Sequence, residues 1–453
     1  MSPLSFRLTS RPVQTARNLF FYTVAAAAVW QALLDGAAAQ AGRLVGALAM
    51  LLFLAAVVPV LGRQAQLLIA IVVPIGHLLL VLYAPTADRW TQAMTAGGGF
   101  ALLLGALPFA TRFIGMERAA TGGSGKSGRR LSLPRVGVIQ FGLSVALSIG
   151  ALWVVRPLYE ALSPAKGSRY RSVSAAYSSN VSVSPLDAVV NLVLVLTGLT
   201  YTQYMPFGLG LAAVIVAATS AVELGLRLRR HVRGTPRRAA ATAPVAGLDA
   251  VLLRTALLIV LVVAAKTMLA FESEVLETGV VLAGVSVLLI AATEGPASVG
   301  AALREHPGRV GQFVPVFALL GAALFFAETV AGSPVAEAIV SVARGAAALP
   351  PGASAVAIIL FTAGLALSGV HMLLTVSTLG AVLSPEVLGM SAPAFAVLLI
   401  TSYIVAMNVS PFVPFTIASA EIAGDRGPLA AIYHALPVWV FVAVVAGIVA
   451  SFL

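Results

Sequence analysis

The sequence contains no cysteine and few charged residues. Only 10% of its 453 residues are charged and 59% are hydrophobic, which gives a mean hydropathy of +0.99. A soluble domain usually carries about 25% charged residues, so the polar surface needed for a soluble enzyme of this size is missing. The absence of cysteine excludes disulfides, thiolate metal sites and cysteine nucleophiles. The composition predicts an all-α polytopic membrane protein.

Motifs of catalysis are also missing. The sequence has no HExxH metal motif, no GxSxG motif, no close pair of carboxylates within one apolar segment and no loop long enough to fold as an ATPase domain. The segment GGSGKSGRR at 122–130 has the letters of a phosphate loop but no preceding strand, which favours a flexible basic loop. We therefore expect no enzyme activity and no cofactor, apart from Na⁺ as a coupling ion.

Lysine is scarce and arginine is clustered. Of the 28 basic residues three are Lys, and the net charge is +11. The clusters lie at 7–17, 112–135, 227–238 and 304–309. In a membrane protein such clusters indicate the cytoplasmic side. We expect a multi-pass protein of the cytoplasmic membrane with a cytoplasmic N-terminus, whose partner is the lipid bilayer and not nucleic acid.

Apolar segments of about 20 residues are long enough to cross a bilayer as helices. They predict about 10–12 transmembrane helices in two halves, 1–240 and 241–453, with a short interfacial helix at 335–346. The candidate spans are 18–34, 42–62, 65–84, 94–113, 136–156, 206–226, 250–270, 276–293, 313–331, 353–370, 391–408 and 429–451.

Successive loops of a membrane protein lie on alternate sides of the membrane, and this alternation leaves the role of one apolar segment open. The Ser-rich stretch 157–185 is expected outside, although it contains Arg169 and Arg171, and the basic block 227–238 is expected inside. One crossing is therefore needed between them, where two apolar stretches stand. We expect a re-entrant hairpin near 186–204 followed by a crossing at 206–226; a single broken helix is the alternative.

Polar residues and prolines interrupt two later segments, 368–384 and 401–421. Pro411 and Pro414 cannot both lie inside a regular helix, because each removes a backbone donor. A hairpin and broken helices over 368–424 are therefore expected, with a plain proline kink as the alternative. A similar patch at 197–208 in the first half indicates an inverted repeat, the pattern of many transporter sites.

The candidate site residues come from these patches. Unwound carbonyls and hydroxyls suit Na⁺, and the start of a second half-helix suits an anion. The expected substrate contacts are Thr200, Thr202, Gln203, Ser377, Thr378, Ser410 and Thr416. The expected cation contacts are Asn408, Ser410, Thr375 and Gly198.

A few titratable residues are candidates for proton coupling. These are His371, Glu328 and Glu421. Each also has a purely structural interpretation. His371 is then a hydrogen-bonded histidine, Glu328 an acid at the membrane interface and Glu421 a helix cap. Glu223 lies four residues before Arg227, a spacing that indicates an ion pair on one helix face.

The segment NVSPFVPFTIASAEIAGD at 408–425 resembles the C-terminal part of the ion-transporter superfamily. It is most similar to the large membrane subunit of TRAP transporters and to divalent-anion:sodium symporters. The matching positions in this C-terminal fifth are Ser410, Pro411, Ala418, Ser419, Ile422, Ala423 and Gly424. The resemblance implies an elevator transporter with hairpins and broken helices, often dimeric, that carries a small organic anion with Na⁺ or H⁺.

These observations predict a secondary active transporter, elevator-type and homodimeric, that moves a carboxylate-like anion coupled to Na⁺ or H⁺. Two alternatives remain open. A cation/proton antiporter would depend on a titrating acid, and a membrane-embedded enzyme or assembly protein would show turnover or a partner without solute flux.

Overall fold

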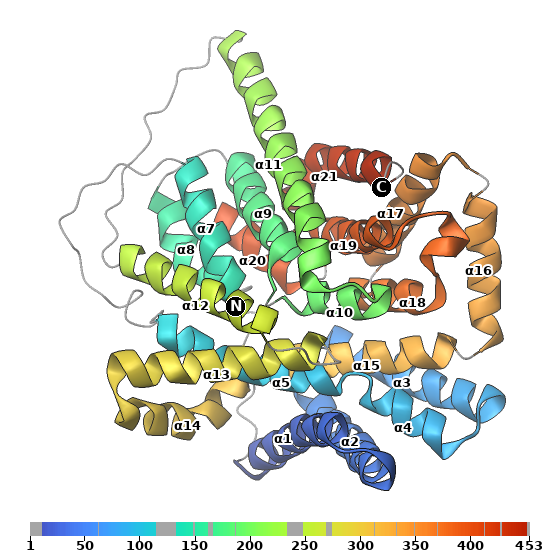
Figure 1. The fold of residues 1–453 in the computed structure, drawn as a ribbon. Coiled ribbons are helices and arrows are strands. Elements are labelled where there is room, and N and C mark those ends of the chain that lie inside the picture. The colour runs from blue at the N-terminus through green and yellow to red at the C-terminus, as the bar shows by residue number, and fades with distance from the viewer. Residues whose placement is uncertain are drawn as a thin grey trace. The chain divides into compact units, whose positions relative to one another are not determined.

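In a computed structural model of the chain the described residues form helices (Figure 1), and no strand occurs among them. The described residues are 11–61, 63–114, 133–147, 150–161, 166–185, 187–232, 248–268, 274–311, 313–331, 333–347, 349–368, 370–411, 413–425 and 428–450. The basic loop at 122–130 and the side chain of Lys266 lie outside this set. The helices divide into two compact units, each built from separate stretches of chain. Unit 1 comprises 1–109, 264–342 and 377–383, and unit 2 comprises 110–263, 343–376 and 384–453.

Unit 1 contains the N-terminal helices and a later group. Helix α15 packs on α2, α3 and α4, and α1 packs along α2. The helices are α1 (Arg11–Leu33), α2 (Gly36–Val57), η1 (Val58–Val60), α3 (Arg63–Tyr83), α4 (Ala87–Thr95), α5 (Gly98–Ile114), α13 (Glu274–Glu294), α14 (Pro296–Val310), α15 (Val314–Ala331) and α16 (Pro334–Ala347). The last of these is the helix expected at 335–346, and it bends by 84° from α15.

Aromatic rings fill the core of unit 1. Phe21, Phe53 and Phe317 come from three helices and lie with ring centroids 4.9–6.2 Å apart. His306 closes this region from α14: its Nδ1 accepts from the Tyr22 hydroxyl at 2.8 Å, and its Nε2–H donates to the Gly105 carbonyl at 2.6 Å. Both ring nitrogens of the neutral imidazole are thereby satisfied.

Unit 2 is organised around two helices, α9 and α19, that are buried over most of their length. Helices α7 and α11 pack on α9, and α17 and α21 pack on α19 (Figure 1). The helices are α7 (Leu133–Leu147), α8 (Gly150–Ala161), α9 (Lys166–Val183), α10 (Ala188–Thr197), α11 (Tyr201–Val232), α12 (Leu248–Met268), α17 (Pro351–Leu367), α18 (Met372–Val382), η2 (Pro385–Leu388), α19 (Ala392–Val409), α20 (Pro414–Ala423) and α21 (Pro428–Ala450). Helices α5, α12, α16 and α18 each have residues in both units.

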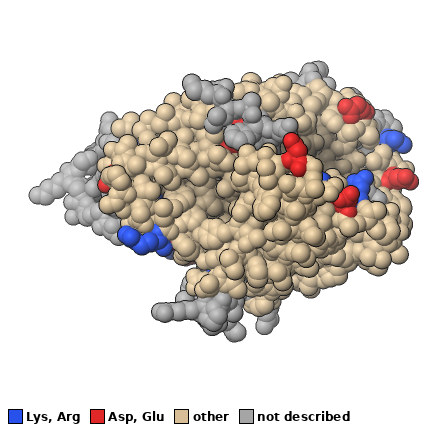
Figure 2. Space-filling model, turned by 60° about the horizontal axis from the view of Figure 1, so that its bottom comes forward, with Lys and Arg blue, Asp and Glu red and all other residues tan. Residues whose placement is uncertain are grey.

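Length and composition make this chain an all-α polytopic membrane protein, as predicted. Within the described residues seven helices are long and apolar enough to cross a bilayer, or eight if the bent pair α15–α16 is one span. Five further apolar helices are shorter. Figure 2 shows the corresponding surface: most of that face is uncharged, and Lys, Arg, Asp and Glu occur in a few small groups.

The prediction that 157–185 forms a polar external stretch was wrong. Residues 166–183 form α9, and nearly all of its side chains are buried, including Ser174, Ser178 and Asn180. Serine hydroxyls can bond to carbonyls of their own helix, as Ser182 does to Ser179 at 2.7 Å. A helix of low hydropathy can therefore be buried when other helices surround it.

The described helices give a broken candidate span for the crossing that the sequence left unplaced. Helices α9 and α10 together cover 166–197, which has the length and hydropathy of one candidate span, and α11 provides the next at 201–226. Residues 186–204, where a hairpin was expected, contain the second half of the broken span and the turn into α11.

Candidate functional site

The first helix break in unit 2 separates α9 from α10. Pro185 removes a backbone donor there, and Asp187 restarts the helix as an N-cap by accepting from the Val189 N–H at 2.9 Å. Asn191 donates its side-chain amide to the carbonyls of Pro185 and Asp187, both at 2.9 Å. The break is thus built from side chains that satisfy its own backbone.

Two tyrosines of α11 satisfy the carbonyls at the end of α9. Tyr201 donates to the Val183 carbonyl at 2.6 Å, and Tyr204 donates to the Ser182 carbonyl at 2.7 Å. The last carbonyls of a helix have no partner within it, so these hydroxyls replace the missing bonds. Gly208 lies so close to the Ser182 carbonyl that a Cβ there would collide with it. The small residue allows α11 to approach the break.

The second break separates α19 from α20. Ser410 ends α19, and its hydroxyl donates to the Ala366 carbonyl of α17 at 2.9 Å. Pro414 opens α20, and Thr416 donates to the Met407 carbonyl at 2.7 Å. The proline pair predicted from the sequence therefore produces a true helix break and not a kink.

The two broken helices share one pattern. Helices α9 and α19 each have 18 residues, and α10 and α20 each have 10. Tyr177 precedes Val183-Ser184-Pro185 at the same spacing as Tyr403 precedes Val409-Ser410-Pro411. Each second half ends at a glycine in the left-handed region, Gly198 with φ 66° and Gly424 with φ 72°.

The short helix of each broken pair packs against the long helix of the other pair: α20 lies against α9, and α10 lies against α19. The side chain of Asn408 joins the two long helices, α9 and α19. Its amide nitrogen donates to the Ser178 hydroxyl at 2.8 Å, and its amide oxygen accepts from Ser174. Asn408, Ser174 and Ser178 are fully buried. This amide therefore fixes the two long halves against each other inside unit 2.

Several buried polar groups on these helices have no partner among the described residues. Both amide atoms of Asn180 are unpaired, although the residue is 0% exposed. The unpaired hydroxyls on these helices include those of Ser179, Thr401, Ser402 and Ser419. An unpaired buried polar group costs about 1–3 kcal/mol, and native proteins seldom leave such groups unpaired without a functional reason. These groups are therefore the strongest candidates for contact with a solute or ion.

The starts of the two second halves differ in charge. The carboxylate of Asp187 caps α10, whereas Val413 provides no side-chain cap for α20. A helix start carries partial positive charge. The N-terminus of α20 is therefore available to an anion, whereas the N-terminus of α10 is already capped by the Asp187 side chain.

Four predicted site residues surround the turn between α10 and α11. Thr200 and Gln203 form a reciprocal helix cap: the Thr200 N–H donates to Gln203 Oε1 at 2.9 Å, and the Gln203 N–H donates to Thr200 Oγ1 at 3.4 Å. Thr202 is exposed and lies 3.1 Å from the Thr200 hydroxyl. Gly198 ends α10. These contacts start and end helices, and a solute contact at this turn stays a prediction.

The predicted residues around α18 are polar groups with few partners. The hydroxyls of Thr375 and Thr378 have no partner in the described part of the chain. In unit 1 the Ser377 hydroxyl donates to the Ala323 carbonyl at 3.4 Å, a long bond. In unit 2 His371 Nδ1 accepts from the Leu373 N–H at 3.2 Å at the start of α18. This is the contact of a helix cap, and proton coupling by His371 stays a prediction.

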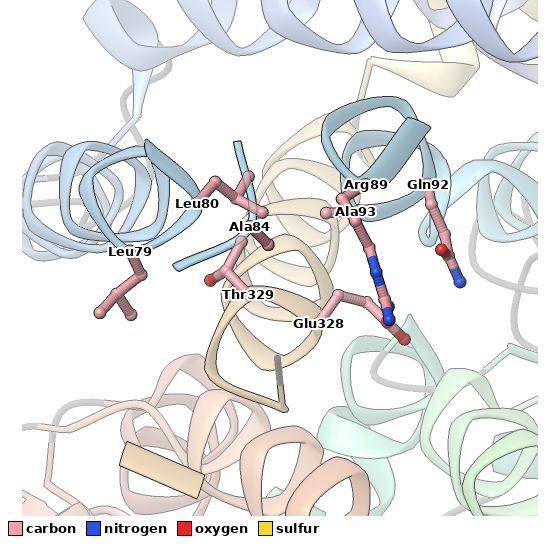
Figure 3. Close-up of a pocket in the computed structure, with 8 residues that line it drawn as sticks. All are labelled: Leu79, Leu80, Ala84, Arg89, Gln92, Ala93, Glu328 and Thr329. Carbon is pink, nitrogen blue, oxygen red and sulfur yellow. The ribbon is translucent and has the colours of Figure 1, made fainter. Parts of the chain in front are cut away.

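The candidate acids have basic neighbours. Glu421 forms an ion pair with Arg156 at 2.8 Å. Glu328 lines a small pocket of unit 1, and Figure 3 shows its carboxylate beside the guanidinium of Arg89. Glu223 pairs with the buried Arg171 of α9 at 2.6 Å. The side chain of Arg227 lies outside the described residues, so the predicted pair of Glu223 with Arg227 stays a prediction.

The structure of the chain is similar to solved structures of known proteins. No family model and no curated protein sequence matches the chain. Its structure is similar to the crystal structure of the YdaH transporter from Alcanivorax borkumensis, described as having an unusual topology. The TM-score is 0.54, the identity is 15%, and the match covers 86% of this chain and 99% of that one. The chain shares the fold of that transporter. The resemblance to TRAP subunits and divalent-anion symporters stays a prediction.

Sequence reasoning missed Asn180 and Ser179, because the Ser-rich stretch around them was assigned to a loop. The signal that could have found them is the repeated arrangement of tyrosine and Val-Ser-Pro before each break. It marks the end of α9 as the counterpart of the end of α19, where Asn408 was predicted.

Proposed function

We propose that this protein is a secondary active transporter that moves a small organic anion across the cytoplasmic membrane, coupled to Na⁺ or H⁺, by an elevator-type movement. The transporter fold supports the general class. The substrate class, the coupling ion and the movement are inferences from the two helix breaks.

One observation carries the proposal: two helices of matched length, each broken at a Ser-Pro pair, pack crosswise around buried polar groups without partners. Discontinuous helices at membrane depth are stable only where they are buried in protein or line a cavity. Transporters commonly bind solutes and ions at such breaks. The matched pattern also supports the internal repeat predicted from the sequence.

The groups at the breaks suit a cation and an anion. Neutral oxygens of Asn180, Thr401 and Ser402 have free lone pairs, which is the donor chemistry that binds Na⁺ in preference to softer metals. The uncapped start of α20 favours a carboxylate. In this mechanism the cation orders the unwound backbone, and the ordered backbone then accepts the anion.

The experiment is uptake into liposomes that contain the purified protein, with a panel of radiolabelled carboxylates and with Na⁺, K⁺ or a pH gradient imposed. Uptake of one carboxylate only with a Na⁺ or H⁺ gradient would support the proposal. Cation or proton flux without uptake of any organic anion would replace it with the antiporter. The absence of all flux, together with turnover or a copurified partner, would replace it with the enzyme or assembly protein.

Thermal unfolding identifies the ligand independently of flux. A ligand that binds only the folded state raises the melting temperature. An anion that stabilises the protein only in the presence of Na⁺ would define the substrate class and the order of binding. The same purified sample gives the oligomeric state by its mass in detergent, which tests the proposed homodimer.

A further inference from the structure

A cavity in unit 2 lies at the start of α9, away from the two helix breaks. It has a volume of about 570 Å³, within the range of roughly 300–1,000 Å³ common for small-molecule sites. Three helices form it: the start of α9, the last turns of α11 and the first turns of α21. We propose that this cavity binds the phosphate headgroup of an anionic phospholipid. The inference does not rest on the proposed transport function.

The cavity lies where three candidate spans end. Span 166–197 begins at its wall with Lys166, span 201–226 ends there with Leu226, and span 428–450 begins a few residues before Tyr433. Spans begin and end at the boundary between hydrocarbon and water, which is where phospholipid headgroups lie. The Arg-rich segment 227–238 follows directly, and the positive-inside rule assigns this boundary to the cytoplasmic leaflet.

The lining is basic. Lys166, Arg171, Arg229 and His434 contribute to it, and no acid is among the described residues that line it. Arg171 is neutralised by Glu223 at 2.6 Å and is held by the His434 carbonyl at 2.8 Å. Lys166 and Arg229 are both exposed. The cavity therefore has a fixed floor and two cations available at its rim.

The remaining wall is apolar. Val222, Leu226 and Leu436 line the cavity beside these cations. On the same helices Leu228 is 58% exposed, Leu429 is 66% exposed and Tyr433 is 76% exposed. Tyrosine is enriched at the level of the headgroups, and exposed leucines beside it suit acyl chains. A phosphate with attached acyl chains matches this combination better than a free anion, which needs no apolar wall.

Basic cavities between membrane helices on the cytoplasmic side bind anionic lipid headgroups, and each cation near the surface is worth about 1 kcal/mol, or about fivefold in affinity. Removing both exposed cations, Lys166 and Arg229, should therefore weaken binding about thirtyfold. Arg171 is left unchanged, because its loss would also disturb the packing of α9 on α11.

The test measures binding to the delipidated full-length protein in detergent, by native mass spectrometry and by the melting temperature. The probes are phosphatidylglycerol, phosphatidylcholine with the same acyl chains, and inorganic phosphate. The variant is Lys166→Gln/Arg229→Gln. The matched control is Arg304→Gln/Arg344→Gln, which removes two exposed cations elsewhere.

The expected result is that phosphatidylglycerol binds and raises the melting temperature of the wild type and of the control. Its affinity for the Lys166→Gln/Arg229→Gln variant should fall about thirtyfold, while the melting temperature without lipid stays within 2 °C or so of the wild type. Equal effects of phosphatidylcholine would overturn the proposal, as would equal losses in both double variants. Stabilisation by inorganic phosphate at the same concentration would make this a free-anion site and would also overturn it.

Discussion

Arg171 of α9 and Glu223 of α11 lie 2.6 Å apart, and the Arg171 side chain is 4% exposed. The Ser168 hydroxyl donates to the second carboxylate oxygen at 3.0 Å, so both oxygens of Glu223 have partners. The pair joins the start of one candidate span to the end of the next. Residues 166 and 226 are therefore at the same end of an antiparallel pair of candidate spans.

Replacement of Glu223 by Gln should destabilise the protein by about 3 kcal/mol, because it leaves the buried guanidinium of Arg171 without a counter-charge. The measurement is thermal unfolding in detergent. The double variant Arg171→Met/Glu223→Leu should recover most of the loss, since apolar pairs often replace buried ion pairs without cost. A single variant as stable as the wild type would contradict the role assigned to this pair.

Asn180 and Asn408 provide a matched comparison of two buried amides. Asn180→Ala should abolish solute uptake and change stability by less than 1 kcal/mol or so, because the described structure gives this amide no protein partner to lose. Asn408→Ala should cost about 1–3 kcal/mol, since it leaves buried hydroxyls on α9 unpaired. Uptake and melting temperature are measured on the same preparations. Normal uptake by Asn180→Ala would remove it from the site.

Tyr204→Phe should weaken the break between α9 and α10. The variant removes one oxygen and leaves the buried Ser182 carbonyl without its donor, at a cost of about 1–3 kcal/mol. Hydrogen exchange of the backbone near Ser184 should increase in the same variant. Tyr433→Phe is the control, because Tyr433 is 76% exposed and should change neither quantity. Equal exchange in both variants would show that the hydroxyl of Tyr204 is dispensable.

His306 should make unit 1 less stable at acidic pH. Burial lowers the pKa of its imidazole below the usual value. The unfolded chain therefore takes up a proton near pH 6.5 while the folded chain does not. Stability from this group is complete above about pH 6.5 and falls as the pH decreases towards the lowered pKa. Melting temperatures between pH 5 and 8 should show this slope, and His306→Gln should flatten it.

Local rules were enough to predict some features of the candidate site. Each proline in a helix interior removes a backbone donor and clashes with the preceding turn. Two prolines three residues apart, Pro411 and Pro414, predicted the second break directly, whereas single prolines such as Pro74 and Pro206 lie inside helices. The first break has a single proline, and the hydroxyls that satisfy its carbonyls come from Tyr201 and Tyr204 of the next helix. The position of the first break, between α9 and α10, could be predicted only by comparing the sequence around Pro185 with that around Pro411.

The partners of buried side chains could not be predicted in this way. The i, i+4 spacing of Glu223 and Arg227 describes one helix and gives no sign that Arg171 reaches Glu223 from another helix. The described bonds of Asn408 go to α9 and to its own helix, and its role as a cation contact stays a prediction. Such pairs depend on which helices meet, and no spacing within one helix encodes that.

The sequence by itself determined that this is an all-α membrane protein with interrupted helices, because composition, hydrophobic length and proline act locally. Only the tertiary structure decided that the Ser-rich α9 is buried. Hydrogen bonds offset the cost of burying its hydroxyls inside unit 2: Ser174 donates to Asn408 of α19, and Ser182 donates to a carbonyl of α9 itself. Tertiary packing also decided which polar groups remain without partners, because an amide such as that of Asn180 is unpaired only with respect to the helices that surround it.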